Sequence, residues 1–229
     1  MDNAKPLPTP MVSGLKLSSQ EGDLFDDVTL YRSTVGALQY LTITRPYIAY
    51  SVNKVCQFMQ APLHLHWKAV KRILRYLNGT MNFCLQLTAS ASLHLHGYCD
   101  ADWANDPDDR RSTSGFCWFL GGSPIVWCSK KQPIVSRSST EAEYRSLANA
   151  TSELIWLQSL ITELHIPLSK TPVLWCDNLS TISLSANPVL HSKSKHIELD
   201  LYFVREKVLF KHLSVQHVPS IDQAGDILT

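Results

Sequence analysis

A change of hydrophobic period near residue 83 constrains the fold of this 229-residue chain more than any other feature. Before this point, apolar residues recur every three or four positions, which is the spacing of amphipathic helices. After it, short segments alternate between apolar and polar residues with a period of two, which indicates strands. The sequence therefore predicts a small helical part followed by a larger part built around a sheet.

The helical part is predicted to occupy residues 27–90, after an extended arm at residues 1–26. The arm holds three prolines among its first ten residues and has little periodicity. Three helices should follow, at residues 31–45, 46–60 and 66–80, with Pro46 in the first turn of the second. The remaining residues, 91–229, are predicted to form the sheet-containing domain.

The third predicted helix carries two stripes at helical spacing. The apolar stripe consists of Trp67, Val70, Leu74 and Leu77. The basic stripe consists of Lys68, Lys71, Arg72 and Arg75. Such a basic stripe is most often a solvated face, and the alternative is a face that contacts the phosphates of nucleic acid. Both interpretations stay open at this point.

Four short segments after residue 82 have the period of strands, and they cover residues 83–87, 93–99, 115–121 and 124–129. Turn residues separate them, so an antiparallel meander is expected. The longest helix of the chain should follow, at residues 138–165. After it, the sequence predicts a strand at 173–177, helices at 178–186 and 195–210, a strand at 213–218 and the start of a last helix at 222–229. This order predicts an α/β fold with a mixed sheet.

Two glutamates near the start of the long helix have different predicted roles. The apolar face of this helix runs from Leu147 to Leu164 in steps of three and four, and extending it back by four residues reaches Glu143. Glu141 instead lies three residues after Ser138, which is the spacing of a capping box. Glu143 is therefore predicted to point toward the sheet, where a charge is costly unless it is paired or binds a metal ion.

Two aspartates lie at the ends of predicted strands. Asp177 closes one strand, and Asp100 follows another in the run "GYCDADWAND". An isolated pair such as Asp100 and Asp102 is usually a solvated turn. Together with Glu143, however, Asp100 and Asp177 form an oxygen-only set that suits hard cations such as Mg²⁺ or Mn²⁺. Two such ions would activate water and stabilise the leaving oxygen of a phosphodiester, which predicts a metal-dependent nuclease.

Several motifs occur in a fixed order along the chain. They are the stretch from "YCDADWANDPDDRRSTSGFCWFLGG" to "SSTEAEYRSLANA", then "LWCDN", "KHIELDLYFVRE" and "VPSIDQAGDILT". Together they resemble the ribonuclease H domain of copia-type LTR retrotransposon polyproteins. Upstream, "YRSTVGALQYLTITRPYIAYSVNKVCQFM" and "HWKAVKRILRYLNGT" resemble the segment that joins the reverse transcriptase of those elements to this domain. The resemblance covers nearly the whole chain.

The resemblance implies a ribonuclease H-like α/β fold, with a mixed sheet flanked by helices and preceded by a small helical segment. It places the catalytic, metal-binding carboxylates of the family on Asp100, Glu143, Asp177 and Asp226. Asp102 becomes a neighbour that tunes the site without binding metal. The implied activity is hydrolysis of the RNA strand of RNA–DNA hybrids with two Mg²⁺ or Mn²⁺ ions.

Three departures from the family pattern bear on function. No Tyr-x-Asp-Asp motif is present, so DNA synthesis is not expected. No histidine lies between Val218 and Asp226, where cellular ribonucleases H carry one in a loop near product release. Only three residues follow Asp226, a length at which a helix is marginal, so we expect Asp226 to be weakly held. The alternative function is therefore a non-catalytic transposon remnant that at most binds nucleic acid.

The remaining features concern binding and location. Lys130, Lys131 and Gln132 lie between two predicted strands, where they either contact the backbone of a hybrid or form an exposed turn. Lys195 and His196 belong to the family pattern, and a phosphate contact is the one role we can suggest for them. The six cysteines lack a C-x-x-C pair and are interpreted as reduced, mostly buried thiols of an intracellular protein. No secretory signal or bilayer-spanning run is visible, so the expected partner is an RNA–DNA hybrid and not a membrane.

Overall fold

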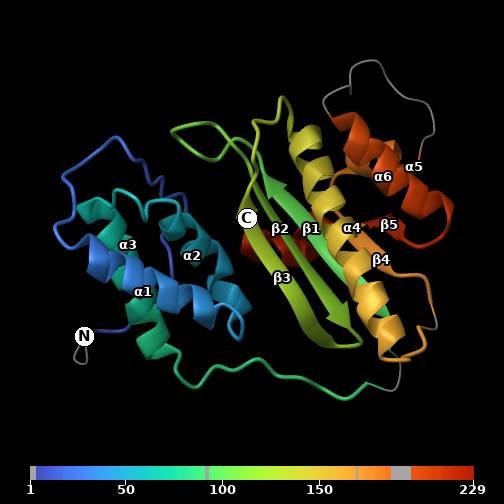
Figure 1. Cartoon of the computed structure of the whole chain (residues 1–229), viewed down its shortest axis with the longest axis horizontal. Helices are drawn as coiled ribbons and strands as arrows, with labels where there is room; N and C mark the ends of the chain where they lie inside the picture. The colour runs from blue at the N-terminus through green and yellow to red at the C-terminus, as the bar shows by residue number, and fades with distance from the viewer. Residues whose placement is uncertain (1–3, 91–92, 169, 187–196) are drawn as a thin grey trace. The chain divides into compact units, whose positions relative to one another are not determined.

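The computed structural model describes residues 4–90, 93–168, 170–186 and 197–229 (Figure 1). The chain forms two compact units. Unit 1 comprises the chain up to Leu85 together with Asn105–Arg110, and unit 2 comprises Gln86–Ala104 together with Arg111–Thr229. The predicted domain boundary at residue 90 stays a prediction.

Unit 1 contains the helices α1 (Val28–Leu41), α2 (Ala49–Cys56) and α3 (His64–Gly79), with a short 3₁₀ helix, η1 (Pro46–Ile48), before α2. The predicted helical part is confirmed, although α1 begins three residues earlier than its apolar pattern indicates. The reason is Asp27, whose carboxylate accepts a hydrogen bond from the Leu30 N–H at 2.8 Å and so caps the helix.

The three helices of unit 1 share one apolar core. Its buried members come from α1, α2, α3 and the arm: Leu17, Tyr31, Val35, Leu38, Ile48, Val52, Val55, Phe58, Ala69, Val70 and Ile73. The Tyr31 hydroxyl is buried in this core and donates a hydrogen bond to the Val55 carbonyl at 2.8 Å, which joins α1 to the end of α2.

The loop Asn105–Arg110 belongs to unit 1 because it packs on the arm. The Asp108 carboxylate accepts hydrogen bonds from the Ser18 hydroxyl at 2.5 Å, and from the Ser19 N–H and hydroxyl at 2.7 Å each. The buried His66 ring lies beside this contact and bonds to the Ser18 carbonyl at 3.0 Å. The chain therefore passes from one unit to the other three times.

Unit 2 is built on a five-stranded mixed sheet with the order β3-β2-β1-β4-β5. The strands β1 (Leu95–Asp102), β2 (Thr113–Leu120) and β3 (Ser123–Lys131) form the antiparallel meander, while β4 (Val173–Cys176) and β5 (Ser214–His217) run parallel to β1. This arrangement confirms the predicted α/β fold with a mixed sheet.

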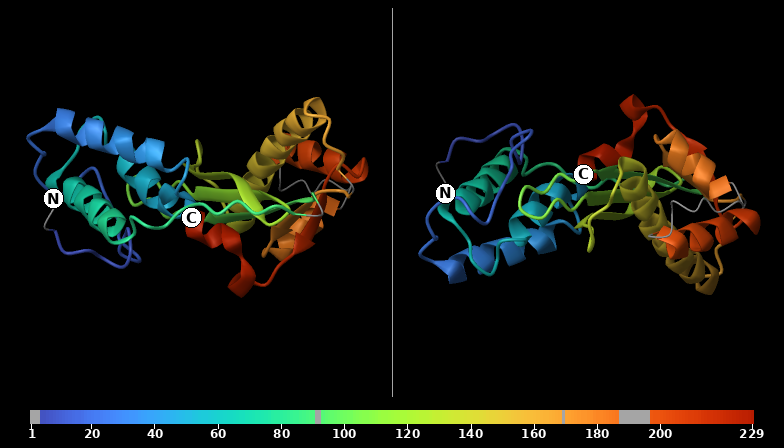
Figure 2. Two further views of the ribbon diagram at one scale, coloured as in Figure 1. Left: turned by 90° about the horizontal axis from the view of Figure 1, so that it is seen from below. Right: turned by 90° about the horizontal axis from the view of Figure 1, so that it is seen from above.

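Helices flank the sheet of unit 2. They are α4 (Ser139–Glu163), α5 (Leu179–Ala186) and α6 (Glu198–Leu209), followed by the 3₁₀ helices η3 (Ser220–Asp222) and η4 (Ala224–Leu228). In Figure 2 the strands are seen as a thin layer with α4 beside it. The helix α4 packs on β1 and β2. The indole of the buried Trp118 donates a hydrogen bond from β2 to the Ala150 carbonyl of α4 at 3.0 Å. A Cβ at Gly97 would lie 2.7 Å from this indole, so a larger residue there would displace Trp118.

Two predictions of secondary structure were wrong. Residues 83–87 form no strand, and the side chains of Phe83 and Leu87 are exposed, so this short apolar run has no sheet or core to join. Residues 222–229 do not begin an α-helix. They form parts of η3 and η4, because Gln223 between them has an extended backbone with φ −75° and ψ 99°. Within the described parts of the chain, no helix has the length and apolar character needed to cross a membrane.

Candidate active site

Glu143 lies in the first turns of α4 and points toward β1, as the apolar face of the helix predicts. Its side chain is only 6% exposed, and its Oε1 accepts a hydrogen bond from the Ala101 N–H of β1 at 3.3 Å. Its Oε2 is buried and has no hydrogen-bond partner among the described residues. Burial, reinforced by repulsion from the Asp100 carboxylate, raises the pKa of Glu143 to about 10.

Glu141, two residues earlier, has a structural role. Ser138 caps α4, since its hydroxyl accepts a hydrogen bond from the Glu141 N–H at 3.2 Å. The Glu141 carboxylate accepts one from the Arg137 N–H at 2.9 Å and forms an ion pair with Arg145 at 2.7 Å. In a capping box the Glu141 carboxylate would accept from the N–H of the cap residue Ser138, but here it accepts from the residue before it. Glu141 therefore forms an ion pair, whereas Glu143, two residues later on the same helix, has an oxygen without a partner among the described residues.

Asp177 follows the end of β4, next to the helix α5 that Asn178 caps through a 3.0 Å bond from the Thr181 N–H. Its Oδ2 accepts a hydrogen bond from the Ser220 hydroxyl at 2.9 Å. One ligand atom from each of Glu143, Cys176 and Asp177 lies within 4.8 Å of the others. Residues far apart in sequence thus bring two carboxylates and a thiol together.

Asp100 lies near the end of β1, and its half-buried carboxylate accepts a hydrogen bond from the Thr229 hydroxyl. Burial raises the pKa of Asp100, and the charge of Asp177 adds to the shift. Asp100 also repels Glu143, so these three carboxylates share one electrostatic environment. Asp102, at the end of the same strand, is exposed.

Asp226 lies on η4, which is anchored more firmly than the sequence predicts. The buried Gln223 donates a hydrogen bond to the Cys99 carbonyl of β1 at 2.9 Å and accepts one from the Gly225 N–H at 3.1 Å. Gly225 lies so close to β1 that a Cβ there would be 3.0 Å from the Asp100 Cβ. Asp226 itself is exposed, and burial, Asp100 and Asp177 all raise its pKa. The fourth carboxylate therefore senses the same negative charges.

Sequence reasoning missed two residues of this site. Gln223 positions η4, but its role depends on a contact 124 positions away in the chain, which no local pattern reveals. Cys176 is fully buried, and its thiol lies beside Glu143 and Asp177. Its signal in the sequence is its place directly before Asp177 at the end of an apolar strand, which is equally typical of a core thiol.

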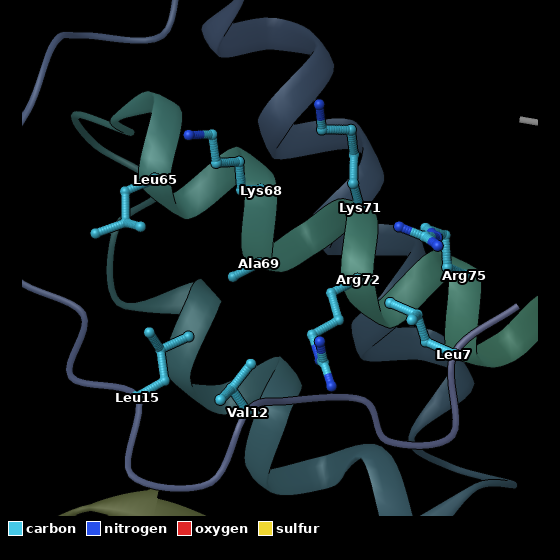
Figure 3. Close-up of a pocket in the computed structure, with 9 residues that line it drawn as sticks. All are labelled: Leu7, Val12, Leu15, Leu65, Lys68, Ala69, Lys71, Arg72 and Arg75. Atoms are coloured by element: carbon cyan, nitrogen blue, oxygen red, sulfur yellow. The ribbon is translucent and has the colours of Figure 1, made fainter. Parts of the chain in front are cut away.

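The basic stripe of α3 lies in unit 1, partly under the arm (Figure 3). Lys68 and Lys71 are exposed. Arg72 donates a hydrogen bond to the Thr9 hydroxyl at 2.6 Å, and Arg75 donates one to the Lys5 carbonyl at 2.7 Å. A hollow of about 460 Å³ lies between these basic side chains and the apolar arm residues Leu7, Val12 and Leu15. The stripe thus divides into two exposed lysines and two arginines that hold the arm.

The other predicted contacts have different environments. Lys130 and Lys131 lie at the end of β3, and Lys130 is exposed. The prediction that Gln132 contacts a hybrid or lies in an exposed turn is wrong. The residue is 2% exposed, and its amide nitrogen donates hydrogen bonds to Ser114 and Ala142 at 2.9 Å each. Its amide oxygen accepts a bond from Ser136 at 2.8 Å, so the side chain is saturated within the protein. Lys195 and His196 lie outside the described residues.

The chain is similar in sequence to known proteins over its whole length. No family model matches the chain. It is 52% identical over 229 residues to the retrovirus-related Pol polyprotein from transposon RE2 of Arabidopsis thaliana, covering 100% of this chain and 16% of that protein. The corresponding polyprotein from transposon TNT 1-94 of Nicotiana tabacum is 40% identical over 238 residues, covering 100% of this chain and 18% of that protein. The chain thus spans less than a fifth of the length of these relatives.

Among solved structures, the chain is matched to LC11-RNase H1, isolated from compost. It is 16% identical to this chain with a TM-score of 0.46, over 59% of this chain and 91% of that protein.

Proposed function

Because the chain belongs to the copia-type Pol polyproteins of retrotransposons, we propose that unit 2 hydrolyses the RNA strand of RNA–DNA hybrids with two Mg²⁺ or Mn²⁺ ions. The observation that carries the proposal is the convergence of Asp100, Glu143, Asp177 and Asp226 from β1, α4, the end of β4 and η4. A bound cation would offset the negative charge that these groups carry when they are ionised.

The residues present fit a hard divalent cation. Carboxylate oxygens are the donors that Mg²⁺ and Mn²⁺ prefer. The Glu143 Oε2 is buried away from water and has no hydrogen-bond partner among the described groups, so it is available to bind a cation. Asp100, Glu143, Asp177 and Asp226 would hold the metal, which when bound activates water and stabilises the leaving oxygen of the phosphodiester.

The chain's own groups hold these carboxylates in place. The Ala101 N–H fixes one oxygen of Glu143 and leaves the other available. The Thr229 hydroxyl donates a hydrogen bond to Asp100, and the Ser220 hydroxyl donates one to Asp177. Preorganised carboxylates of this kind bind a cation without the cost of ordering flexible side chains.

Nucleic acid should be bound through its backbone and groove shape, since hybrid recognition depends on 2′-hydroxyl and phosphate contacts more than on base identity. We propose Lys68 and Lys71 of α3, with Lys130 and Lys131 of β3, as phosphate contacts. We also propose Arg72 and Arg75 of the same helix, although both bond to the arm in this structure. Gln132 is excluded from this set, because its amide is saturated inside unit 2.

The test is a cleavage assay on the full chain with Mg²⁺ or Mn²⁺ and three matched substrates of one sequence: an RNA–DNA hybrid, double-stranded RNA and double-stranded DNA. Cleavage of the RNA in the hybrid alone is expected. Asp177→Asn should abolish it, whereas Asp102→Asn, at the exposed end of β1, should retain most of it. Equal cleavage of double-stranded DNA would contradict the proposal. Salt-dependent binding without cleavage would favour a non-catalytic transposon remnant.

A further inference from the structure

We propose that the carboxylate cluster of unit 2 also captures a thiophilic divalent cation of the Zn²⁺ and Cd²⁺ class, with Cys176 as its sulfur ligand beside Glu143 and Asp177. The first ground is geometry. One ligand atom from each of the three residues lies within 4.8 Å of the other two, so a single ion can reach all three after small side-chain rotations. The oxygens alone suit Mg²⁺, and the sulfur changes that preference.

The second ground is that Glu143 and Cys176 are both buried and that one oxygen of Glu143 has no partner among the described residues. Glu143 is 6% exposed, and its Oε2 has no partner among the described residues. Cys176 is 0% exposed, and its thiol makes a long contact of 4.0 Å with the Asn178 carbonyl. A buried oxygen and a buried sulfur thus adjoin the same space.

The third ground is a second thiol on the neighbouring strand. Parallel pairing of β1 and β4 places Tyr98 opposite Trp175 and so brings Cys99 next to Cys176. Cys99 is also fully buried, and its thiol donates a hydrogen bond to the Trp175 carbonyl at 3.7 Å. A thiophilic ion bound to Cys176 would therefore have the sulfur of Cys99 nearby, whereas a hard ion would bind the carboxylates.

Binding at this site is an exchange of a proton for a metal. The Cys176 thiol and the Glu143 carboxyl each release a proton to the solvent, and the sulfur and the carboxylate oxygen bind the incoming cation with no change of oxidation state. Zn²⁺ is commonly held by a mixture of cysteine sulfur and carboxylate oxygen, and Cd²⁺ shares this preference for sulfur. Such an ion should displace Mg²⁺ and block cleavage; that consequence rests on the proposed function, but the binding itself does not.

The test uses Cd²⁺ as the probe and the ultraviolet sulfur-to-cadmium charge-transfer band as the readout, which needs no nuclease activity. The full chain carries Cys84→Ser throughout, because Cys84 is exposed and would bind Cd²⁺ by itself. The background protein should give a saturable band. Cys176→Ser should weaken the affinity at least about tenfold and reduce the band, because it removes a ligand.

Two further variants keep the test sharp. Cys117→Ser, a matched buried cysteine on β2, should leave the band and the affinity unchanged. Glu143→Gln should weaken Cd²⁺ binding while all buried thiols remain, and circular dichroism checks that each variant is folded. An unchanged band in Cys176→Ser, or no band in the background protein, would overturn the inference. A protein that binds Cd²⁺ through Cys176 but never cleaves hybrids would refute the proposed function alone.

Discussion

At the scale of single residues, the site depends on which glutamate of α4 faces β1. Glu141 forms an ion pair with Arg145 and accepts a hydrogen bond from the Arg137 N–H, whereas Glu143 reaches the cluster with one oxygen unpaired among the described groups. Helical geometry decides this difference, because the two positions are about 200° apart around the helix axis. A change of helical phase by one residue would remove the carboxylate from the site.

The raised pKa of Glu143 predicts a pH dependence of the metal-free protein. The folded carboxyl holds its proton up to about pH 10, whereas the unfolded one loses it near 4.5. The folded state therefore binds more protons in this interval, and the free energy of unfolding should fall as pH rises, by up to about 1.4 kcal/mol per pH unit. Urea unfolding with a chelator at several values between about pH 6 and 9, inside the interval where the two states differ in bound protons, measures the slope.

Glu143→Gln should flatten that slope, since the amide does not ionise. Glu163→Gln, an exposed position at the end of α4, should leave it unchanged and serves as the control. A slope that is the same in all three proteins would show that Glu143 ionises normally in the folded state.

Asp177→Asn should have opposite effects on stability with and without metal. In the metal-free protein the substitution removes one charge from the carboxylate cluster while the amide oxygen can still accept the bond from Ser220, so the melting temperature should stay equal or rise. With Mn²⁺ at about 100 times its dissociation constant, the wild type alone should gain about 2.7 kcal/mol. Melting curves of both proteins with and without Mn²⁺ test this, and an equal gain in both would exclude Asp177 as a ligand.

At the scale of elements, α3 presents lysines that are exposed and arginines that hold the arm. Lys68→Gln with Lys71→Gln should reduce the slope of log affinity for hybrid against log salt by up to about 0.9 for each phosphate that is no longer neutralised. Arg72→Gln with Arg75→Gln should reduce it less, because both arginines already bond to the arm. Lys170→Gln with Lys211→Gln, two exposed lysines of unit 2, is the matched control. Equal slopes in all variants would make this face of α3 a solvated one.

The 3₁₀ helix η4 depends on one side chain. Gln223→Ala removes the bond to the Cys99 carbonyl and leaves that buried acceptor unsatisfied, so it should lower the free energy of unfolding by about 1–3 kcal/mol. The exposed Gln216, which bonds to Ser214 at 3.2 Å, provides the control, and Gln216→Ala should change stability little. Urea unfolding measures both. A change of the same size in both variants would mean that Gln223 does not anchor η4.

Sequence predicted the elements with strong periodicity and missed those that depend on distant contacts. The phase of α4 is evident from the sequence because its apolar steps continue over much of a 25-residue helix, and this placed Glu143 correctly toward the sheet. Residues 83–87 alternate like a strand, but a strand forms only where a neighbour offers hydrogen bonds. Glutamine usually lies at the surface, which favoured an exposed Gln132, yet Ser114, Ser136 and Ala142 saturate its amide from three separate segments.

At the scale of the whole molecule, the thiol of Cys176 illustrates what sequence cannot supply. Its place beside Glu143 requires the parallel pairing of β1 with β4, which joins strands that are distant in the sequence, and no local pattern encodes that register. The carboxylates were found because their charge is anomalous in apolar surroundings, whereas a buried cysteine is ordinary.

Unit 1 is built from two separate stretches of the chain, because Asn105–Arg110 returns to it and bonds to the arm. A protease cut after Leu85 would divide the polypeptide into two fragments. The first fragment should still bind the second, because Ser18 and Ser19 donate hydrogen bonds to the Asp108 carboxylate, which lies in the second fragment. The two pieces should therefore co-elute in gel filtration and reassemble when expressed separately. Asp108→Ala should cause the two fragments to dissociate, because it removes the contact that joins them.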